Sequence, residues 1–297
     1  MTGFICIDKP QNMTSFTAAN RARAILGCKK AGHTGTLDPM ATGVLPIALS
    51  GATRFIELLP TAEKGYTARV RLGLTTDTLD ITGTVLSQSA VQVTPAQIEE
   101  AALSFLGESM QTPPMYSALS KDGVRLYELA RRGETVERVQ RKIKISALTV
   151  SDFAENEFTL CVTCSAGTYI RSLADDIGRK LGCGAALSAL RRTAANGFTL
   201  HDCISLDELE ALRDAGKVQE HIFPVDKCLF AYSAITVTAP QAVRFQNGGE
   251  LFLNRIGSPK AGLYRIYAPD GRFLGLGEVP AEETADALAV RRVFVDG

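Results

Sequence analysis

The stretch FTLCVTCSAGTYIRSLADDIGRKL, residues 158–181, joins a predicted strand to a predicted helix through one tight turn. Residues 158–165 alternate in the manner of a strand with one buried face, and Gly167 permits a sharp change of direction. From about residue 168 onward, apolar side chains recur at helical spacing. These side chains are Ile170, Leu173, Ile177 and Leu181. A strand followed directly by an amphipathic helix predicts a sheet that is covered by helices.

The other segments of the first 230 residues support the same fold class. Strands and helices follow no regular βαβα order, which favours an α+β fold over a doubly wound sheet. Ser15 is the expected cap of a helix at 15–27. The helices expected at 94–107 and 205–216 each begin with a Ser or Thr followed three residues later by Gln or Glu. The expected strands lie at 4–8 and 66–72, and the expected helices at 15–27, 94–107 and 205–216.

The pattern of apolar and turn-forming residues changes after about residue 233. Short apolar runs separated by turn residues, including a Pro-Asp-Gly turn at 269–271, predict a small all-β module. Its strands are expected at 250–256, 262–268, 272–278 and near 290–295. We therefore expect two domains, residues 1–232 and 233–297.

The bulk composition excludes several classes of protein. Of the 297 residues 45% are hydrophobic, the formal net charge is zero, and no apolar run approaches the roughly 18 residues that span a bilayer. Charged residues occur too early for a secretion signal, and seven cysteines in such a chain suggest reduced thiols and a cytoplasmic location. Cys161 and Cys164 form a CxxC pair on opposite faces of a strand, so we expect no metal site.

The segment HTGTLDPMATGVLP, residues 33–46, places one carboxylate, that of Asp38, among turn-forming and apolar residues. By itself this pattern favours an aspartate that accepts hydrogen bonds from nearby amides in a turn. The alternative is a nucleophile or base on a rigid loop, which in a dry setting requires a counter-charge. The glycines lack the Lys-Ser/Thr of a P-loop, so a nucleotide-triphosphate site is not expected.

Arg171 is one candidate for that counter-charge. It lies in the first turn of the helix, where a cation opposes the helix dipole and therefore needs a favourable partner. Asp175, four residues later on the same helix, is one possible partner, and a distant carboxylate such as Asp38 is the other. Tyr66 begins the alternating strand on its apolar face and is either a core residue or a stacking surface.

The segment 111–145 is the most basic part of the chain. Eight cationic and four acidic side chains lie between residues 120 and 145, flanked by turn-forming residues. Charge alone favours a solvated helix and loop, and the alternative is a mobile arm that grips phosphates. We refer to residues 111–145 as the basic arm.

Several blocks of sequence resemble the bacterial tRNA pseudouridine-55 synthases of the TruB family. They occur in the order of the family and span most of residues 1–230. The blocks are IDKPQNMTSF (7–16), AGHTGTLDPMATGVLPIALSGATRF (31–55), KGYTARVRLGLTTDTLDITG (64–83), QTPPMYSALSKDGVRLYELARRG (111–133), CSAGTYIRSLADDIGRKLGCGA (164–185), LRRTAANGFTL (190–200) and FPVDKCL (223–229).

The resemblance implies a role for each matching residue of the site. Asp38 matches the catalytic aspartate of the family, and Arg171 matches the arginine that pairs with it. Tyr66 matches the tyrosine that stacks on the target uracil. Tyr169 and Leu190 match residues that line the base pocket.

Further positions follow from the same resemblance. His33 matches a histidine that enters the RNA where the uridine has flipped out. Lys9 and Pro10 match a motif that supports the active-site loop. The basic arm matches the insertion that clamps the T arm, and residues 233–297 lie where the family carries a PUA-like RNA-binding domain.

The implied fold is the pseudouridine synthase fold, with a central mixed, largely antiparallel sheet flanked by helices and a small C-terminal PUA-like β-domain. The implied activity is isomerisation of uridine 55 in the T arm of tRNA by an intramolecular transfer that needs no cofactor and no metal. We expect a monomer in the cytoplasm that binds tRNA, with no membrane and no obligatory protein partner. The alternatives are a guide-RNA-dependent synthase and an RNA chaperone, and the chaperone has no need of Asp38.

Overall fold

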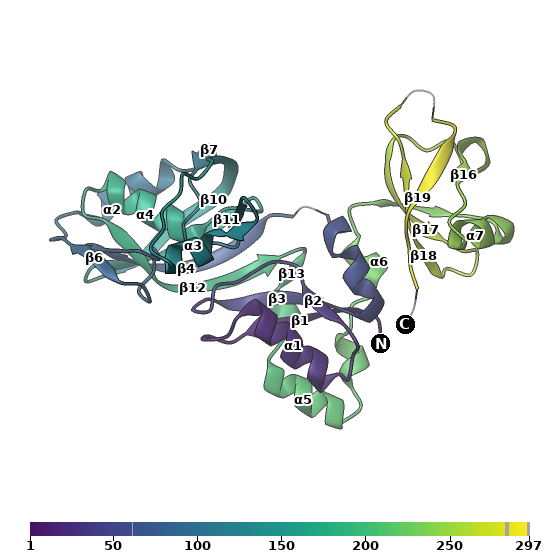
Figure 1. Ribbon diagram of the computed structural model, residues 1–297, viewed down its shortest axis with the longest axis horizontal. Helices are drawn as coiled ribbons and strands as arrows, with labels where there is room; N and C mark the ends of the chain where they lie inside the picture. Colours follow the sequence, from purple (N-terminus) through teal and green to yellow (C-terminus); the bar gives the residue numbers. More distant parts are fainter. Residues whose placement is uncertain (61, 283–284, 296–297) are drawn as a thin grey trace.

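The computed structural model describes residues 1–60, 62–282 and 285–295, and these form one large and one small sheet (Figure 1). Within these ranges the large sheet has ten strands in the order β14-β1-β3-β12-β4-β11-β10-β7, with β2 on β3 and β13 on β12. The pairs β1–β14 and β3–β12 are parallel and the others antiparallel, which confirms the expected mixed, largely antiparallel sheet. Its strands are β1 (Gly3–Lys9), β2 (Ala31–His33), β3 (Thr42–Leu49), β4 (Lys64–Leu72), β7 (Gly107–Gln111), β10 (Arg141–Ala154), β11 (Glu157–Cys164), β12 (Ala185–Ala195), β13 (Phe198–Thr199) and β14 (Cys203–Ile204).

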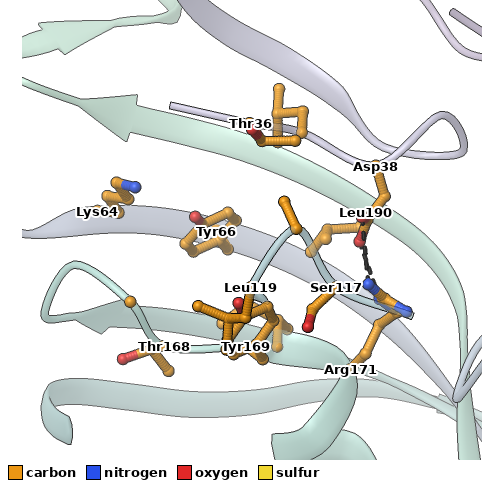
Figure 2. A pocket seen from close by; sticks show the side chains of 14 residues that line it. Thr36, Asp38, Lys64, Tyr66, Ser117, Leu119, Thr168, Tyr169, Arg171 and Leu190 are labelled. Atoms are coloured by element: carbon orange, nitrogen blue, oxygen red, sulfur yellow. Dashed lines mark hydrogen bonds and ion pairs between the residues drawn. The ribbon is translucent and has the colours of Figure 1, made fainter. Parts of the chain in front are cut away.

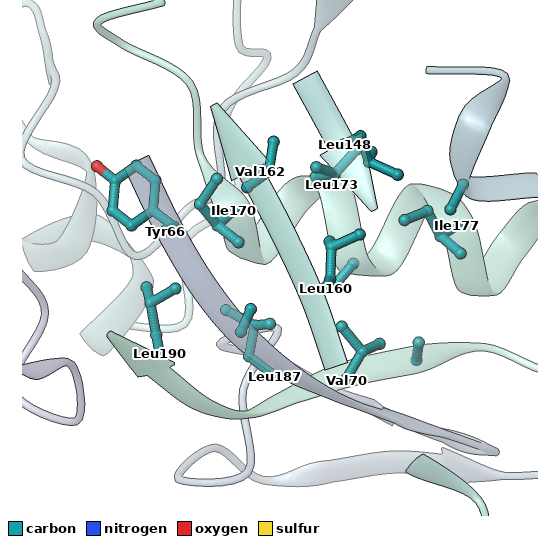
Figure 3. Close-up of a cluster of buried hydrophobic side chains, with 14 of the residues drawn as sticks. Tyr66, Val70, Leu148, Leu160, Val162, Ile170, Leu173, Ile177, Leu187 and Leu190 are labelled. Atoms are coloured by element: carbon teal, nitrogen blue, oxygen red, sulfur yellow. The ribbon is translucent and has the colours of Figure 1, made fainter. Parts of the chain in front are cut away.

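Helices cover each half of this sheet. α2 (Pro95–Leu103) and α4 (Ile170–Lys180) pack on the half that contains β4, β11 and β10, and α1 (Ser15–Ile25) and α5 (Leu206–Asp214) pack on the half that contains β1 and β3 (Figure 1). Figure 3 shows how Ile170, Leu173 and Ile177 of α4 pack against apolar side chains of the sheet. No helix in the described part of the chain has the length and apolar character needed to cross a membrane.

The helix boundaries differ from the sequence predictions at two points. Thr14, and not Ser15, caps α1 through a 3.0 Å bond from the Thr17 amide, because the Ser15 hydroxyl is buried and bonded to Leu37. α2 has the predicted capping box but ends four residues early, and Gly107, with φ +92°, instead begins β7. α5 has the predicted capping box and ends at Asp214.

Shorter elements connect these parts. A hairpin of β5 (Leu74–Thr76) and β6 (Val85–Gln88) follows β4, and the basic arm contains a hairpin and a short helix between β7 and β10. The arm elements are β8 (Ser120–Lys121), β9 (Val124–Arg125) and α3 (Leu126–Arg131). The remaining short helices of this part are η1 (Ser50–Leu58), η2 (Leu200–Asp202), η3 (Val218–His221) and α6 (Val225–Cys228).

The small sheet has the strand order β15-β17-β18-β19-β16, which agrees with the predicted C-terminal β-domain. The structure adds the helix α7, which the prediction of a purely β module missed although Thr238 and Gln241 form a capping box at its start. The expected strand at 250–256 is only two residues long and continues as a short helix. The elements are β15 (Ser233–Thr236), α7 (Ala239–Gln246), β16 (Leu251–Phe252), η4 (Leu253–Arg255), β17 (Gly262–Tyr267), β18 (Phe273–Val279) and β19 (Ala287–Val293).

Aromatic side chains join the two sheets. The Phe55 ring of η1 lies 6.1 Å from the ring of Phe273 and 6.2 Å from that of Phe294, and Phe55 is fully buried. The Tyr232 hydroxyl donates a 3.0 Å hydrogen bond to the Leu58 carbonyl at the end of η1. The small sheet is therefore packed against the large domain and is not merely tethered to it.

Candidate active site

The loop between β2 and β3 carries Asp38 and is held from both sides. The buried Ser15 hydroxyl accepts a 2.8 Å bond from the Leu37 amide and lies 3.2 Å from the Leu37 carbonyl. The Asn12 amide donates to the Pro39 carbonyl at 2.8 Å, and within the loop the Ala41 amide donates to the Asp38 carbonyl at 3.0 Å. These bonds hold the backbone on each side of Asp38, which gives the side chain a defined direction.

Beneath this loop lies Arg192, a fully buried guanidinium. It donates hydrogen bonds to the carbonyls of Val44 (2.8 Å), Thr36 (3.2 Å) and Gly35 (3.1 Å). Gly43 must be a glycine here, because its φ is +100° and a Cβ would lie 2.2 Å from the Arg192 carbonyl oxygen. The buried charge thus holds the loop that leads to Asp38 through main-chain acceptors.

Asp38 and Arg171 form a bidentate pair (Figure 2). The Nε–Oδ2 distance is 2.8 Å and the Nη2–Oδ1 distance is 3.2 Å. Asp175 instead pairs with Arg179 at 2.8 Å, so the distant carboxylate, and not the helical neighbour, is the partner of Arg171. Asp80 lies 4.0 Å from the Arg171 Nε and adds a second negative charge. These two carboxylates offset the helix dipole that opposes a cation at the start of α4.

Arg171 is 4% exposed and also donates hydrogen bonds to two other segments of the chain. Its Nη1 donates to the Thr78 carbonyl at 2.8 Å, and its Nη2 donates to the Tyr116 carbonyl of the basic arm at 2.7 Å. The Asp38 side chain retains 34% exposure and faces a cavity. The guanidinium is therefore rigid, whereas the carboxylate that it holds stays accessible.

The cavity beside Asp38 has a volume of about 250 Å³, which is small for a ligand site and suits a single planar group. Tyr66 of β4 and Leu190 of β12 belong to its wall on the sheet side, and Tyr169 lies opposite them (Figure 2). The residues that line the cavity are Thr36, Leu37, Asp38, Lys64, Tyr66, Ser117, Ala118, Leu119, Gly167, Thr168, Tyr169, Ile170, Arg171 and Leu190. The cavity is mostly apolar, with one carboxylate at its edge.

The electrostatics of this wall follow from burial. Burial raises the pKa of the Tyr66 hydroxyl, although the positive charge of Arg192 acts in the opposite direction. Burial lowers the pKa of the Lys64 ammonium, and the charge of Arg192 lowers it further. Tyr66 is therefore a neutral aromatic surface at neutral pH.

Of the other predicted site residues, Lys9 and Pro10 lie behind the loop. The fully buried Lys9 ammonium donates to the carbonyls of Met13 (2.7 Å), Pro10 (2.8 Å) and Pro39 (3.4 Å), and burial lowers its pKa to about 8. His33 ends β2 and does not line the cavity, and its buried Nδ1 atom finds no hydrogen-bond partner among the described residues. Burial lowers the pKa of His33, and the charge of Arg192 adds to this effect.

The sequence analysis missed several residues of the site. Lys64 lies two residues before Tyr66 on an alternating strand, so its position on the cavity face was readable from the sequence. Ser117 and Leu119 reach the cavity only because the basic arm folds back over α4, and no local pattern indicates this. Arg192 and Asp80 are buried charges. The partners of Arg192 are distant in the chain, and those of Asp80 lie in its own irregular turn.

This geometry suits chemistry by a single carboxylate on a small planar substrate. A bidentate guanidinium keeps a carboxylate ionised and aimed, and an ionised carboxylate is a nucleophile or a general base. Cys161 is exposed and Cys164 buried, as expected for residues three apart on a strand, which lie on opposite faces. Within the described ranges, no three His, Cys, Asp or Glu side chains gather as a metal-binding group.

Models of known protein families match three consecutive segments of the chain. The model "TruB family pseudouridylate synthase (N terminal domain)" matches residues 23–170. The model "tRNA pseudouridylate synthase B C-terminal domain" matches residues 171–230, and "Pseudouridine synthase II TruB, C-terminal" matches residues 233–294.

Curated proteins with the name tRNA pseudouridine synthase B are similar over nearly the full chain. The protein of Dechloromonas aromatica is 45% identical over 276 residues, covering 93% of this chain and 91% of the relative. A protein of Pseudomonas fluorescens is 44% identical over 297 residues, covering 99% and 96%.

Solved structures share the fold. A chain from a Cbf5-Nop10-Gar1 complex superposes with a TM-score of 0.76 at 28% identity, covering 99% of this chain and 85% of that chain. A chain from the archaeal box H/ACA sRNP Nop10-Cbf5 complex gives 0.74 at 26% identity, covering 99% and 86%.

Proposed function

Because the chain belongs to the TruB family and is a pseudouridine synthase that isomerises uridine in tRNA, we propose that its target is uridine 55 in the T arm. The observation that carries this proposal is the Asp38–Arg171 pair at the edge of a cavity walled by Tyr66 and Leu190. A carboxylate beside a small, mostly apolar cavity provides what the rearrangement of a pyrimidine nucleoside requires.

The reaction is an isomerisation with a closed atom balance. The N1–C1′ bond of uridine breaks, the base turns within the cavity, and a C5–C1′ bond forms. The proton lost from C5 is matched by the proton gained at N1, so no oxidant and no energy source is consumed. In this scheme Asp38 acts as the nucleophile or general base, and Arg171 fixes the direction of its carboxylate.

The cavity walls supply the second requirement, which is to retain the detached base. Tyr66 stacks on one face of the uracil and Leu190 contacts it from the sheet, while Tyr169 closes the opposite side. The target must first leave its stack, at a cost of a few kcal/mol. His33 at the end of β2 offsets part of this by entering the space that the base has left.

The remaining parts of the chain bind the rest of the RNA. The basic arm supplies cations for backbone phosphates, and residues 233–297 act as a PUA-like RNA-binding domain. Lys9 and Pro10 hold the Asp38 loop in register. We propose that the chain acts in the cytoplasm as a monomer without a guide RNA, although the similar solved chains come from complexes with Nop10.

The direct experiment incubates the purified chain with a T-arm hairpin that carries [5-³H]uridine. Tritium release, with the modified position mapped by carbodiimide labelling and primer extension, is expected at uridine 55. A hairpin with cytidine at that position and the Asp38→Asn variant are the controls. Activity that appears only with an added guide RNA or protein partner would instead favour a guide-dependent synthase, and refolding of tRNA without release would favour a chaperone.

A further inference from the structure

Lys64 begins β4 two residues before Tyr66, and both belong to the lining of the cavity. Successive side chains of a strand alternate between faces, so residues 64 and 66 lie on the same face. Figure 2 shows the Lys64 ammonium directed toward the space between Thr36 and Tyr66, at the end of the cavity away from the Asp38–Arg171 pair.

This ammonium differs from the other cations of the site in its partners. Lys9 and Arg192 each donate to three main-chain carbonyls, and Arg171 holds Asp38. Among the hydrogen bonds and ion pairs of the described residues none involves the Lys64 side chain, although its backbone pairs with β11 and its carbonyl accepts a bond from the Cys164 thiol at 3.8 Å. Water alone compensates a partially buried charge less well than a charged partner does, so the site favours an incoming anion.

No carboxylate of the site is free to neutralise Lys64. Asp38 is engaged by Arg171, and the buried Asp80 accepts 2.9 Å bonds from the Thr82 amide and the Thr78 hydroxyl. The charge of Arg192 lies close enough to lower the pKa of Lys64. Two positive charges therefore act at this end of the cavity, and among the described residues neither has an ion-pair partner.

The position of Gly35 places this charge along the Asp38 loop. A Cβ on Gly35 would lie 3.3 Å from the Lys64 Nζ and 3.7 Å from the Arg192 Nη1. The backbone of Gly35 thus runs beside both cations, on the approach from His33 toward Asp38.

We propose that Lys64 binds a phosphate of the RNA backbone adjacent to the uridine whose base enters the cavity. This inference rests on the proposed function and adds a phosphate-binding subsite to it. A uracil carbonyl is neutral and leaves the local positive charge unbalanced, whereas each nucleotide carries one phosphodiester charge. A lysine ammonium is a compact point charge that suits such an anion.

The experiment measures binding of the T-arm hairpin over a range of salt concentrations. For Lys64→Ala we expect affinity about tenfold lower at moderate salt, because one charge-assisted hydrogen bond is lost, and a slope of log K against log salt reduced by about one. Lys64→Arg keeps the charge and the slope. The matched control is Lys217→Ala, which removes an exposed ammonium in the loop after α5 and leaves the slope unchanged.

Neutral methylphosphonate linkages identify the phosphate. Two hairpins are made, one with the neutral linkage on the 5′ side of the target uridine and one with it on the 3′ side. One of them should bind the unaltered chain as weakly as Lys64→Ala binds normal RNA. Binding of that hairpin to Lys64→Ala should show no further loss. An unchanged salt slope for Lys64→Ala overturns the proposal. So does a further loss of affinity when Lys64→Ala is combined with either of the two altered hairpins. So does a Lys64→Ala effect that disappears on an abasic hairpin, because this would indicate a contact with the base.

The two proposals fail separately in this design. Binding reports on Lys64 alone, and thermal unfolding checks that each variant is folded. If the unaltered chain binds the hairpin but releases no tritium, the assignment of uridine 55 fails while the salt slope still tests Lys64.

Discussion

Replacing Arg171 by alanine tests the central pair of the site. The variant loses two charge-assisted bonds to Asp38 and the bonds to the carbonyls of Thr78 and Tyr116. The carboxylates of Asp38 and Asp80 then lack their shared cation. We expect the protein to fold and bind RNA but to lose the fixed orientation of the Asp38 carboxylate.

The magnitude follows from the burial of the pair. Removing one partner of a fully buried ion pair costs about 3–5 kcal/mol. Because the Asp38 side chain keeps 34% exposure, water screens part of this loss, and we take about 3–4 kcal/mol. If the same interaction energy is lost from the transition state, then at about 1.4 kcal/mol per factor of ten kcat falls by roughly two to three orders of magnitude.

The assay is tritium release from the T-arm hairpin under single-turnover conditions, which separates the chemical step from RNA binding. Arg171→Lys keeps the charge but cannot form the two-pronged contact, so its rate should fall between those of Arg171→Ala and the unaltered chain. Asp175→Asn is the matched control, because Asp175 pairs with Arg179, and its rate should stay within about threefold. A folded Arg171→Ala variant with a near-normal rate would refute the reasoning.

The remaining predictions concern the carboxylate, the basic arm and the buried lysine. Asp38→Asn should abolish tritium release while tRNA affinity changes by less than about tenfold, because phosphate contacts dominate binding. Affinity for tRNA should fall steeply with salt, and a flat response in filter binding would count against the basic arm as a phosphate clamp. Burial lowers the pKa of Lys9 from 10.5 to about 8, so the unfolded chain binds more protons between these pH values. The free energy of unfolding from urea titrations should therefore gain a rising contribution across this window, which Lys9→Met should remove.

The elements that local patterns predicted are present in the structure, because such patterns depend on near neighbours, whereas β3, β7, β10 and β12 of the large sheet were not predicted. Alternation along residues 66–72 and 158–165 identified β4 and β11, and capping boxes identified the starts of α2 and α5. The errors also have local causes. Ser15 looked like a cap, but its hydroxyl is used by Leu37, a contact 22 residues away that the local pattern does not contain.

The sequence by itself determined the fold class, the family and which residue types carry the chemistry, because periodicity, caps and contiguous motifs are properties of short stretches of chain. Local patterns left the partner of Arg171 open and the family resemblance implied Asp38, but the tertiary structure shows the pair, across 133 residues, with Asp175 bound to Arg179 instead. It also decided that, among the described residues, the Lys64 side chain has no ion-pair partner. Both outcomes depend on how the Asp38 loop, β4 and α4 meet around one cavity, and that arrangement is set by packing between segments that are distant in sequence.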